Sequence, residues 1–158
     1  MVGARAAVEG DVARLAELCR QAQAELRSQE RGGAVFVARE ARPEPVEDSL
    51  RSAILEPDRT VVLGTIDDTV MGYATGRTEI LRDAATLGVI DDLFVEEEAR
   101  AVGVGEAMMD SLLDWFRTRG CSGVDAMALP GARATKNFFE ESGFSARLLV
   151  MHHRMASG

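Results

Sequence analysis

Apolar residues recur at helical spacing along four stretches of the chain. In each stretch they repeat every three or four positions, with charged or polar residues between them. Gly32-Gly33 follows the first stretch, Pro57 the second, Gly120 the third and Gly143 the fourth, and these residues end helices. The pattern therefore predicts helices over residues 11–31, 46–55, 104–119 and 130–142.

Short apolar runs rich in β-branched residues predict strands between these helices. The runs cover residues 2–7, 60–66, 69–79, 88–95, 123–129 and 144–155. Asp67-Asp68 makes a turn between two of the runs, so we expect those two to form a hairpin. The stretch 34–40 is apolar but fits neither period, and the prolines at 43 and 45 break the chain after it.

The order of these elements predicts a single α/β (α+β) domain over residues 1–158. A strand and two helices come first, then a hairpin that extends to a third strand, and then helix, strand, helix and strand. Such a mixed order is typical of helices packed on a central sheet. A length of 158 residues fits one domain with a sizeable core.

The charge balance excludes several partners. The chain has 18 basic and 26 acidic residues, a formal net charge of −8, which argues against binding nucleic acid or an anionic membrane surface.

The cysteines and histidines indicate neither a disulfide framework nor a metal site. Cys19 and Cys121 make no disulfide framework, and the adjacent His152 and His153 lack the acidic or cysteine neighbours of a metal site. With no signal sequence and no long apolar run, we expect a cytoplasmic protein without a metal.

The clearest candidate chemistry lies where a strand enters a glycine-containing loop that opens a helix. Gly103 and Gly105 allow close approach to the backbone, and the free N–H groups of a helix start attract phosphate. The loop lacks the Gly-Lys-Ser/Thr of nucleotide triphosphatases. A dinucleotide loop fits poorly, because Met108 stands where a third small residue belongs. A helix that merely starts on flexible glycines is the structural alternative.

Two separated motifs resemble the GNAT acetyltransferase superfamily. One segment is similar to its acetyl-CoA-binding motif. This segment reads Leu93-x-Val95, then four residues, then Arg100-x-x-Gly103-x-Gly105, and then an alanine followed by two apolar residues. Downstream, the run from Lys136 to Phe144 resembles the superfamily's final helix and its Gly-Phe turn. The intervals between the motifs also fit, and the resemblance spans roughly residues 60–155.

The resemblance implies a fold, a cosubstrate and a set of binding residues. The implied fold is a mixed, mostly antiparallel sheet of about six to seven strands flanked by about four helices. The implied cosubstrate is acetyl-CoA, whose pantetheine arm would pair with a strand backbone and whose pyrophosphate would sit on a loop. By position in the motif, the strand residues are Leu93, Phe94 and Val95, and the loop residues are Arg100, Ala101, Val102, Gly103, Val104 and Gly105.

Asp91 and Asp92 are the candidate catalytic residues. Acetyl transfer to an amine needs a base, because a free amine has a pKa near about 10 and is protonated at neutral pH. The order Asp-Asp-Leu-Phe-Val is similar to the acidic pair of spermidine/spermine acetyltransferases, which holds a cationic substrate. Strand alternation should send the two carboxylates to opposite faces, so that only one reaches the cleft.

One position departs from the superfamily pattern. Phe139 stands where a tyrosine acid is common, and Tyr73, the only tyrosine, lies in the hairpin, where we expect core packing. We predict an N-acetyltransferase that acetylates a primary amine of a small molecule in a ternary complex. A non-catalytic acyl-CoA-binding sensor or interaction module with the same fold is the alternative. The resemblance also allows a homodimer. We expect residues 29–45 to cover the cleft, but they match no motif, so the sequence does not identify the acetyl acceptor.

Overall fold

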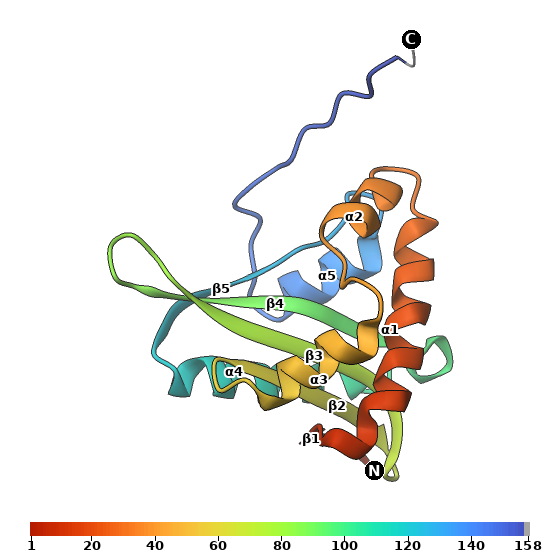
Figure 1. The fold of residues 1–158 in the computed structure, drawn as a ribbon, viewed down its shortest axis with the longest axis vertical. Coiled ribbons are helices and arrows are strands. Elements are labelled where there is room, and N and C mark those ends of the chain that lie inside the picture. Colours follow the sequence, from red (N-terminus) through yellow and green to blue (C-terminus); the bar gives the residue numbers. More distant parts are fainter. Residues whose placement is uncertain (157–158) are drawn as a thin grey trace.

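A five-stranded sheet forms the centre of the computed structural model, which describes residues 1–156 (Figure 1). Its strands follow one another in sequence order from one edge to the other, and neighbours are antiparallel except β4 and β5, which are parallel. The strands are β1 (Val2–Ala6), β2 (Arg59–Ile66), β3 (Thr69–Ile80), β4 (Thr86–Val95) and β5 (Cys121–Ala126).

Helices cover both faces of this sheet. The helices α1 and α3 lie on one face, and α4 and α5 lie on the other, while the short α2 continues beyond the end of α1. Their bounds are α1 (Val12–Arg27), α2 (Gly33–Arg39), α3 (Val46–Leu55), α4 (Val104–Thr118) and α5 (Arg133–Glu141), with 3-10 turns η1 (Glu9–Asp11) and η2 (Glu97–Ala99). None of the described helices is long and apolar enough to cross a bilayer.

The strands divide their side chains between two cores because successive residues point to opposite faces. On one face Leu63 and Tyr73 pack with the apolar sides of α1 and α3. On the other, Val62 and Ala74 pack with α4 and with Phe139 of α5. The two cores fix the sheet between its helical layers.

Glycines let α4 approach the sheet closely. A Cβ at Gly88 would lie 2.6 Å from Cδ1 of Phe116, and a Cβ at Gly76 would lie 2.8 Å from Cζ of the same ring. Phe116 is therefore seated directly on the backbone of β3 and β4. It is 1% exposed and is one of the largest fully buried side chains.

The structure confirms the mixed α/β architecture but corrects its element count. Within residues 1–156 it has five strands rather than six or seven, and five α-helices rather than four. The apolar stretch 34–40 is helical, as α2. The expected strand over 144–155 does not form, because a strand needs a hydrogen-bonded neighbour and this segment runs away from the sheet (Figure 1). The strand expected over 123–129 ends at Ala126.

The seat of Phe116 predicts a large loss of stability on truncation. Phe116→Ala should lower the free energy of unfolding by about 3–5 kcal/mol, because it removes transferred apolar surface and leaves a cavity. Urea unfolding measures this. Leu55→Ala, on the exposed side of α3 where Leu55 is 73% exposed, is the control and should change stability by about 0.5 kcal/mol or less. Equal losses in the two variants would contradict the packing described above.

Candidate active site

The parallel strands β4 and β5 separate part of the way along the sheet. Their pairing begins at Thr86 with Cys121 and ends at Ile90 with Ala126, although β4 continues to Val95. From residue 91 onward, β4 therefore has an open edge on the side that faced β5. We call the region between this edge and the segment after β5 the fork (Figure 1).

The main-chain groups of Leu93 and Val95 point into the fork. In an antiparallel pair, alternate residues bond to the neighbouring strand and the others turn outward. The N–H of Glu96 bonds to the carbonyl of Met71 in β3, so the outward set includes Val95 and Leu93. The Val95 carbonyl indeed accepts a bond from Nε of Arg100, at 2.9 Å, on the side away from β3. Phe94 instead bonds to β3.

The loop after β4 presents backbone N–H groups at the start of α4. Gly103, with φ 100°, is the N-cap, and Ala101 also has a left-handed φ of 65°. The first-turn N–H groups that follow have no carbonyl within the helix to bond to. Gly105 also makes room for Phe138 of α5, because a Cβ on it would lie 3.1 Å from Cε1 of that ring.

Arg100 ties this loop to the neighbouring helix. Its Nη2 binds Oε2 of Glu25 on α1 at 2.7 Å, and its guanidinium lies 5.5 Å from the ring centre of Phe94. Glu96, which begins the acidic run before the loop, turns toward α1 and binds Arg14 at 2.9 Å. Two carboxylates that border the loop, Glu25 and Glu96, are therefore each paired with an arginine.

A β-bulge places both candidate aspartates on the same face of the sheet. Thr75 is opposite Asp92 and Gly76 is opposite Ile90, so Asp91 is the extra residue of β4. Asp92 accepts from the hydroxyl of Thr75 at 2.6 Å, and Asp91 accepts from Nε of Arg77 at 2.9 Å. Residues 75 and 77 share one face of β3. The expectation that the carboxylates point to opposite faces is therefore wrong.

Asp92 is held by three donors. The hydroxyl of Tyr73 donates to Oδ1 at 3.1 Å, while Thr75 and a short contact from Nη2 of Arg42 reach Oδ2. The Asp92 side chain is 16% exposed and that of Arg42 only 9%. Burial, followed by the charge of Asp92, raises the pKa of Tyr73 well above its ordinary value. The phenol therefore keeps its proton and holds the carboxylate in place.

Arg42 is the site residue that sequence reasoning did not find. It follows α2, 50 positions before its partner Asp92, and it also donates to Ser49 at 2.7 Å. Burial opposes its charge, but Asp92 more than offsets this and leaves the pKa of Arg42 raised. Among the described residues, its Nε is the buried side-chain polar atom without a partner. The only sequence signal was an arginine in the segment expected to cover the cleft.

Asp91 is less constrained and stands where the fork begins. It is the first residue of β4 beyond the last pair with β5. Burial raises the pKa of Asp91, and Arg77 offsets only part of this effect. Its side chain is 32% exposed, so solvent and a ligand can reach it.

Residues 29–45 bridge the fork, as the sequence suggested. A Cβ on Gly32 would lie 3.8 Å from Leu129, and one on Gly131 would lie 3.4 Å from Oε1 of Gln29, so this segment touches the chain after β5. A pocket of about 500 Å³ lies between this segment and α1, and its lining includes no residue of β4 or of the loop before α4. The pocket residues come from α1, α2 and the following loop, and include Gln23, Arg27, Val37, Arg42 and Glu44.

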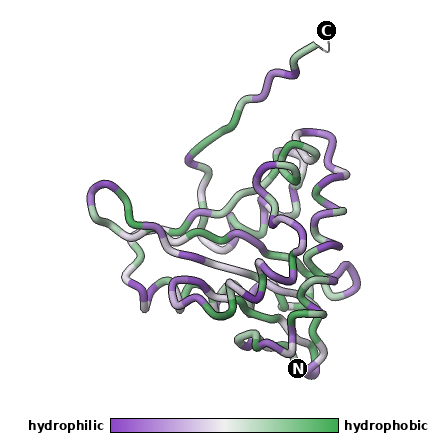
Figure 2. The backbone as a smooth tube through the Cα atoms, viewed as in Figure 1, coloured by the Kyte–Doolittle hydropathy of each residue, from purple (hydrophilic) through white to green (hydrophobic). Residues whose placement is uncertain are grey.

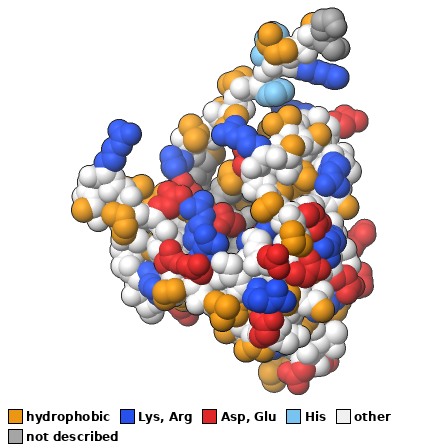
Figure 3. Space-filling model, viewed as in Figure 1, with side chains coloured by type: hydrophobic (Ala, Val, Ile, Leu, Met, Phe, Trp, Pro, Cys, Tyr) orange, Lys and Arg blue, Asp and Glu red, His pale blue; other side chains and the backbone are white. Residues whose placement is uncertain are grey.

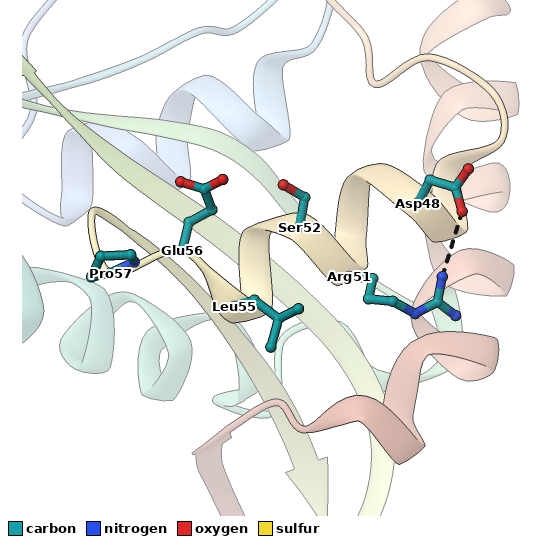
Figure 4. Close-up of a pocket in the computed structure, with 6 residues that line it drawn as sticks. All are labelled: Asp48, Arg51, Ser52, Leu55, Glu56 and Pro57. Carbon is teal, nitrogen blue, oxygen red and sulfur yellow. Dashed lines mark hydrogen bonds and ion pairs between the residues drawn. The ribbon is translucent and has the colours of Figure 1, made fainter.

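A second pocket lies on α3 and is separate from the fork. It measures about 400 Å³ and is lined by Asp48, Arg51, Ser52, Leu55, Glu56 and Pro57 (Figure 4). Asp48 and Arg51 bind each other at its rim. Its lining includes neither of the aspartates of β4 nor any residue of the loop before α4, so the fork remains the candidate site.

Phe139 is part of the core rather than of the fork. It is 8% exposed. Its ring centre lies 5.9 Å from that of Phe138, in an edge-on arrangement, and 5.3 Å from that of Phe144, at a tilt. Its phenyl ring has no acidic proton and cannot act as a general acid. The described residues also hold no group of three or more His, Cys, Asp and Glu side chains that could bind a metal ion.

Comparison with known proteins places the chain in a family. Residues 17–144 match the Acetyltransferase (GNAT) family. A search of curated proteins returned no significant match. Among solved structures, a tetramutant of the BH1408 protein from Bacillus halodurans has a TM-score of 0.81 at 17% identity, covering 96% of this chain and 99% of that one.

Two further solved structures are similar to this chain. AAC(6')-Iy, in complex with a bisubstrate analog of CoA and acetylneamine, has a TM-score of 0.75 at 14% identity, with 99% of each chain covered. The aminoglycoside acetyltransferase meta-AAC0020 from an uncultured soil metagenomic sample, in complex with sisomicin, has a TM-score of 0.71 at 15% identity, covering 99% of this chain and 97% of that one. At these identities the likeness shows the fold. The family match covers most of the chain, which therefore belongs to the GNAT family of acetyl-CoA-dependent N-acetyltransferases.

Proposed function

We propose that this enzyme transfers an acetyl group to a primary amine of a small molecule by direct attack in a ternary complex. The observation that carries the proposal is the bulged acidic pair at the fork, between the open edge of β4 and the segment 29–45. A partly exposed carboxylate at this point supports proton removal from an incoming amine. No side-chain nucleophile is needed for direct attack.

The residues of the fork fit acetyl-CoA. The outward main-chain groups of Leu93 and Val95 offer an edge that amides of the pantetheine arm can join like an added strand. The N–H groups from Ala101 to Gly105, at the positive end of α4, suit its pyrophosphate, whereas the N–H of Arg100 already bonds to the carbonyl of Glu97. When bound, the cosubstrate supplies an acetyl thioester for transfer to the amine.

Asp91 is the general base of this proposal. Burial raises its pKa, and a carboxylate with a raised pKa accepts a proton more readily than an ordinary one. It has one charged side chain bound to it, Arg77, whereas Asp92 has three donors. Asp91 takes the proton from the ammonium group directly or through one water, and the free amine then attacks.

Asp92 is a positioning residue in the same proposal. Tyr73, Thr75 and Arg42 fix both of its oxygens, so it presents a rigid acceptor beside Asp91. A fixed acceptor orients an amine at low entropic cost. The Tyr73 hydroxyl is already bound to Asp92, and Phe139 has no acidic proton to donate. The leaving thiolate therefore takes its proton from water. A thiol pKa of about 8.5 makes this tolerable.

Release of free thiol from acetyl-CoA across a panel of small amines tests the function. We expect turnover with at least one amine. Tight binding of acetyl-CoA, measured by calorimetry, without turnover of any amine would contradict the proposal. That outcome would favour the acyl-CoA sensor, which the loss of the superfamily tyrosine at Phe139 motivates.

Removing the base should abolish most turnover. Asp91→Asn is expected to lower kcat by about 10²–10⁴-fold without changing the affinity for acetyl-CoA. The pH profile adds a second readout, because wild-type turnover should fall as the pH drops through the raised pKa of Asp91, and the variant should lack this dependence. Asp110→Asn, on the exposed side of α4, is the matched control and should retain wild-type kcat.

Neutralising the positioning carboxylate should affect amine binding more than turnover. We expect Asp92→Asn to raise KM for the amine about tenfold or more, and to lower stability by about 3 kcal/mol, because Arg42 is then buried without its partner. The double variant Asp92→Asn with Arg42→Met removes both charges and should recover stability but not KM. If neither Asp91 nor Asp92 affects kcat or amine KM, the acidic pair has no catalytic role.

The loop at the start of α4 can be tested separately. Gly103→Asp places a carboxylate where the pyrophosphate is proposed to bind, and aspartate tolerates the left-handed conformation. Calorimetry should show a loss of acetyl-CoA affinity of about tenfold or more. The positive φ strains the new side chain, so we expect lower thermal stability in this variant, as in its control. Gly120→Asp, also at positive φ but with open space around its Cβ, is the matched control. Equal affinities in both variants would place the pyrophosphate elsewhere.

A further inference from the structure

The proposed catalysis gives no role to the pocket between α1 and the segment 29–45. Its volume of about 500 Å³ is that of a site for a small molecule. Three parts of the chain line it, namely the end of α1, the helix α2 and the loop after α2. The composition of this lining indicates which chemical class of ligand the pocket could hold.

The wall that α2 contributes to the pocket is apolar. Ala34, Val37, Ala38 and Ala41 recur at helical spacing, and all four line the cavity. The hydropathy colouring shows a short hydrophobic stretch here between hydrophilic segments (Figure 2). Within residues 33–39, Gly33 is the one buried residue, so the apolar face of α2 borders the pocket instead of a core. A ligand that fits this wall has an apolar part.

The rest of the lining carries positive charge, in a protein whose formal net charge is −8. Three arginines and one carboxylate, Glu44, line the pocket. Both oxygens of Glu44 bind Arg20, which lies outside the lining, at 2.8 and 3.1 Å. Glu44 therefore does not offset the arginines of the pocket. The space-filling view shows basic side chains beside apolar ones over α2 and the end of α1 (Figure 3).

Arg27 is the arginine of the pocket that has no carboxylate partner within residues 1–156. Of the other two, Arg42 binds Asp92. Arg39 binds its neighbour Glu40 at 3.3 Å. An unpaired guanidinium can bind a carboxylate through two parallel N–H groups. One unpaired cation matches one negative charge, so the pocket suits a monoanion.

Arg42 connects this pocket to the acidic pair of the fork. Its carbonyl accepts a bond from Nε2 of Gln23 at 2.8 Å, which ties it to α1, and its guanidinium reaches Asp92. Arg42 is thus both a lining residue of the pocket and the partner of a carboxylate on β4. A molecule that occupies both places has its two polar ends separated by a chain of several carbons.

We propose that the acetyl acceptor is an amine that carries a carboxylate at the far end of an apolar chain. This inference rests on the proposed function and names its substrate class. The carboxylate binds Arg27, the chain lies along the apolar face of α2, and the amine reaches Asp91. One amine proton passes to Asp91. The nitrogen then bonds to the acetyl carbon while the C–S bond of the thioester breaks, and the thiolate takes a proton from water.

Three amines with chains of equal length test the substrate class. They are ε-aminocaproate, which has the carboxylate, hexylamine, which lacks it, and hexamethylenediamine, which has a cation in its place. We expect kcat/KM, measured as release of free thiol from acetyl-CoA, to be about tenfold higher or more for ε-aminocaproate, because only its carboxylate can pair with Arg27. Equal values for the three amines, or a preference for the diamine, would overturn the proposal.

Reversing the charge of the pocket should reverse this preference. Arg27→Glu changes an exposed side chain, so the fold should persist. We expect the ratio of kcat/KM for ε-aminocaproate to that for hexamethylenediamine to fall about a hundredfold, because one substrate is repelled and the other attracted. Arg117→Glu makes the same change in net charge at an exposed position of α4, on the other face of the sheet, and should keep the wild-type ratio. An equal fall in both variants would contradict a specific role for the pocket.

Binding of hexanoate separates this proposal from the proposed function, because hexanoate has the carboxylate and the chain but no amine. In a nuclear magnetic resonance titration, we expect hexanoate to shift the amides of residues 27 and 34–38, and to bind Arg27→Glu about tenfold more weakly. If hexanoate binds in this way and no amine is turned over, the preference of the pocket for a carboxylate stands and the transferase function fails. If amines are turned over and hexanoate does not bind, the function stands and the present proposal fails.

Discussion

The end of pairing between β4 and β5 is the constraint on which the site depends. Hydrogen bonding stops at Ile90 and Ala126, and each group proposed to act lies beyond that point or borders it. The open edge supplies main-chain partners, the bulge supplies two carboxylates, and the segment 29–45 closes the remaining side. If the pairing of β4 with β5 continued to Val95, β4 would have no open edge there and the fork would not exist.

The net charge of −8 has a local explanation as well as a global one. Three carboxylates around the fork each have an arginine partner, Asp91 with Arg77, Asp92 with Arg42 and Glu96 with Arg14. In the proposed complex, backbone N–H groups would bind an anionic cosubstrate beside these paired carboxylates, although the net charge of the molecule as a whole is negative. This arrangement makes binding depend on local geometry more than on the overall field.

Local sequence predicted the parts of the site that are local in the chain. The strand β4, the glycine loop and α4 occupy consecutive residues, so the spacing of residues along the chain was sufficient to predict these three elements. The orientation of Asp91 was not predictable, because a bulge depends on the register with β3. Arg42 was not predictable either, since its partner lies 50 residues away. The strand expected over 144–155 has the right composition, but forming a strand requires a neighbour that composition does not reveal.

The ion pair between Arg42 and Asp92 couples the position of the segment 29–45 to the electrostatics of the fork. While Arg42 stays in place, it offsets the charge of one aspartate. If the segment lifts and withdraws it, two adjacent carboxylates face the fork with Arg77 as their remaining bound cation. Without Arg42 the two carboxylates would attract a cation more strongly than they do in this structure, so the seating of the segment 29–45 sets the charge that the fork presents.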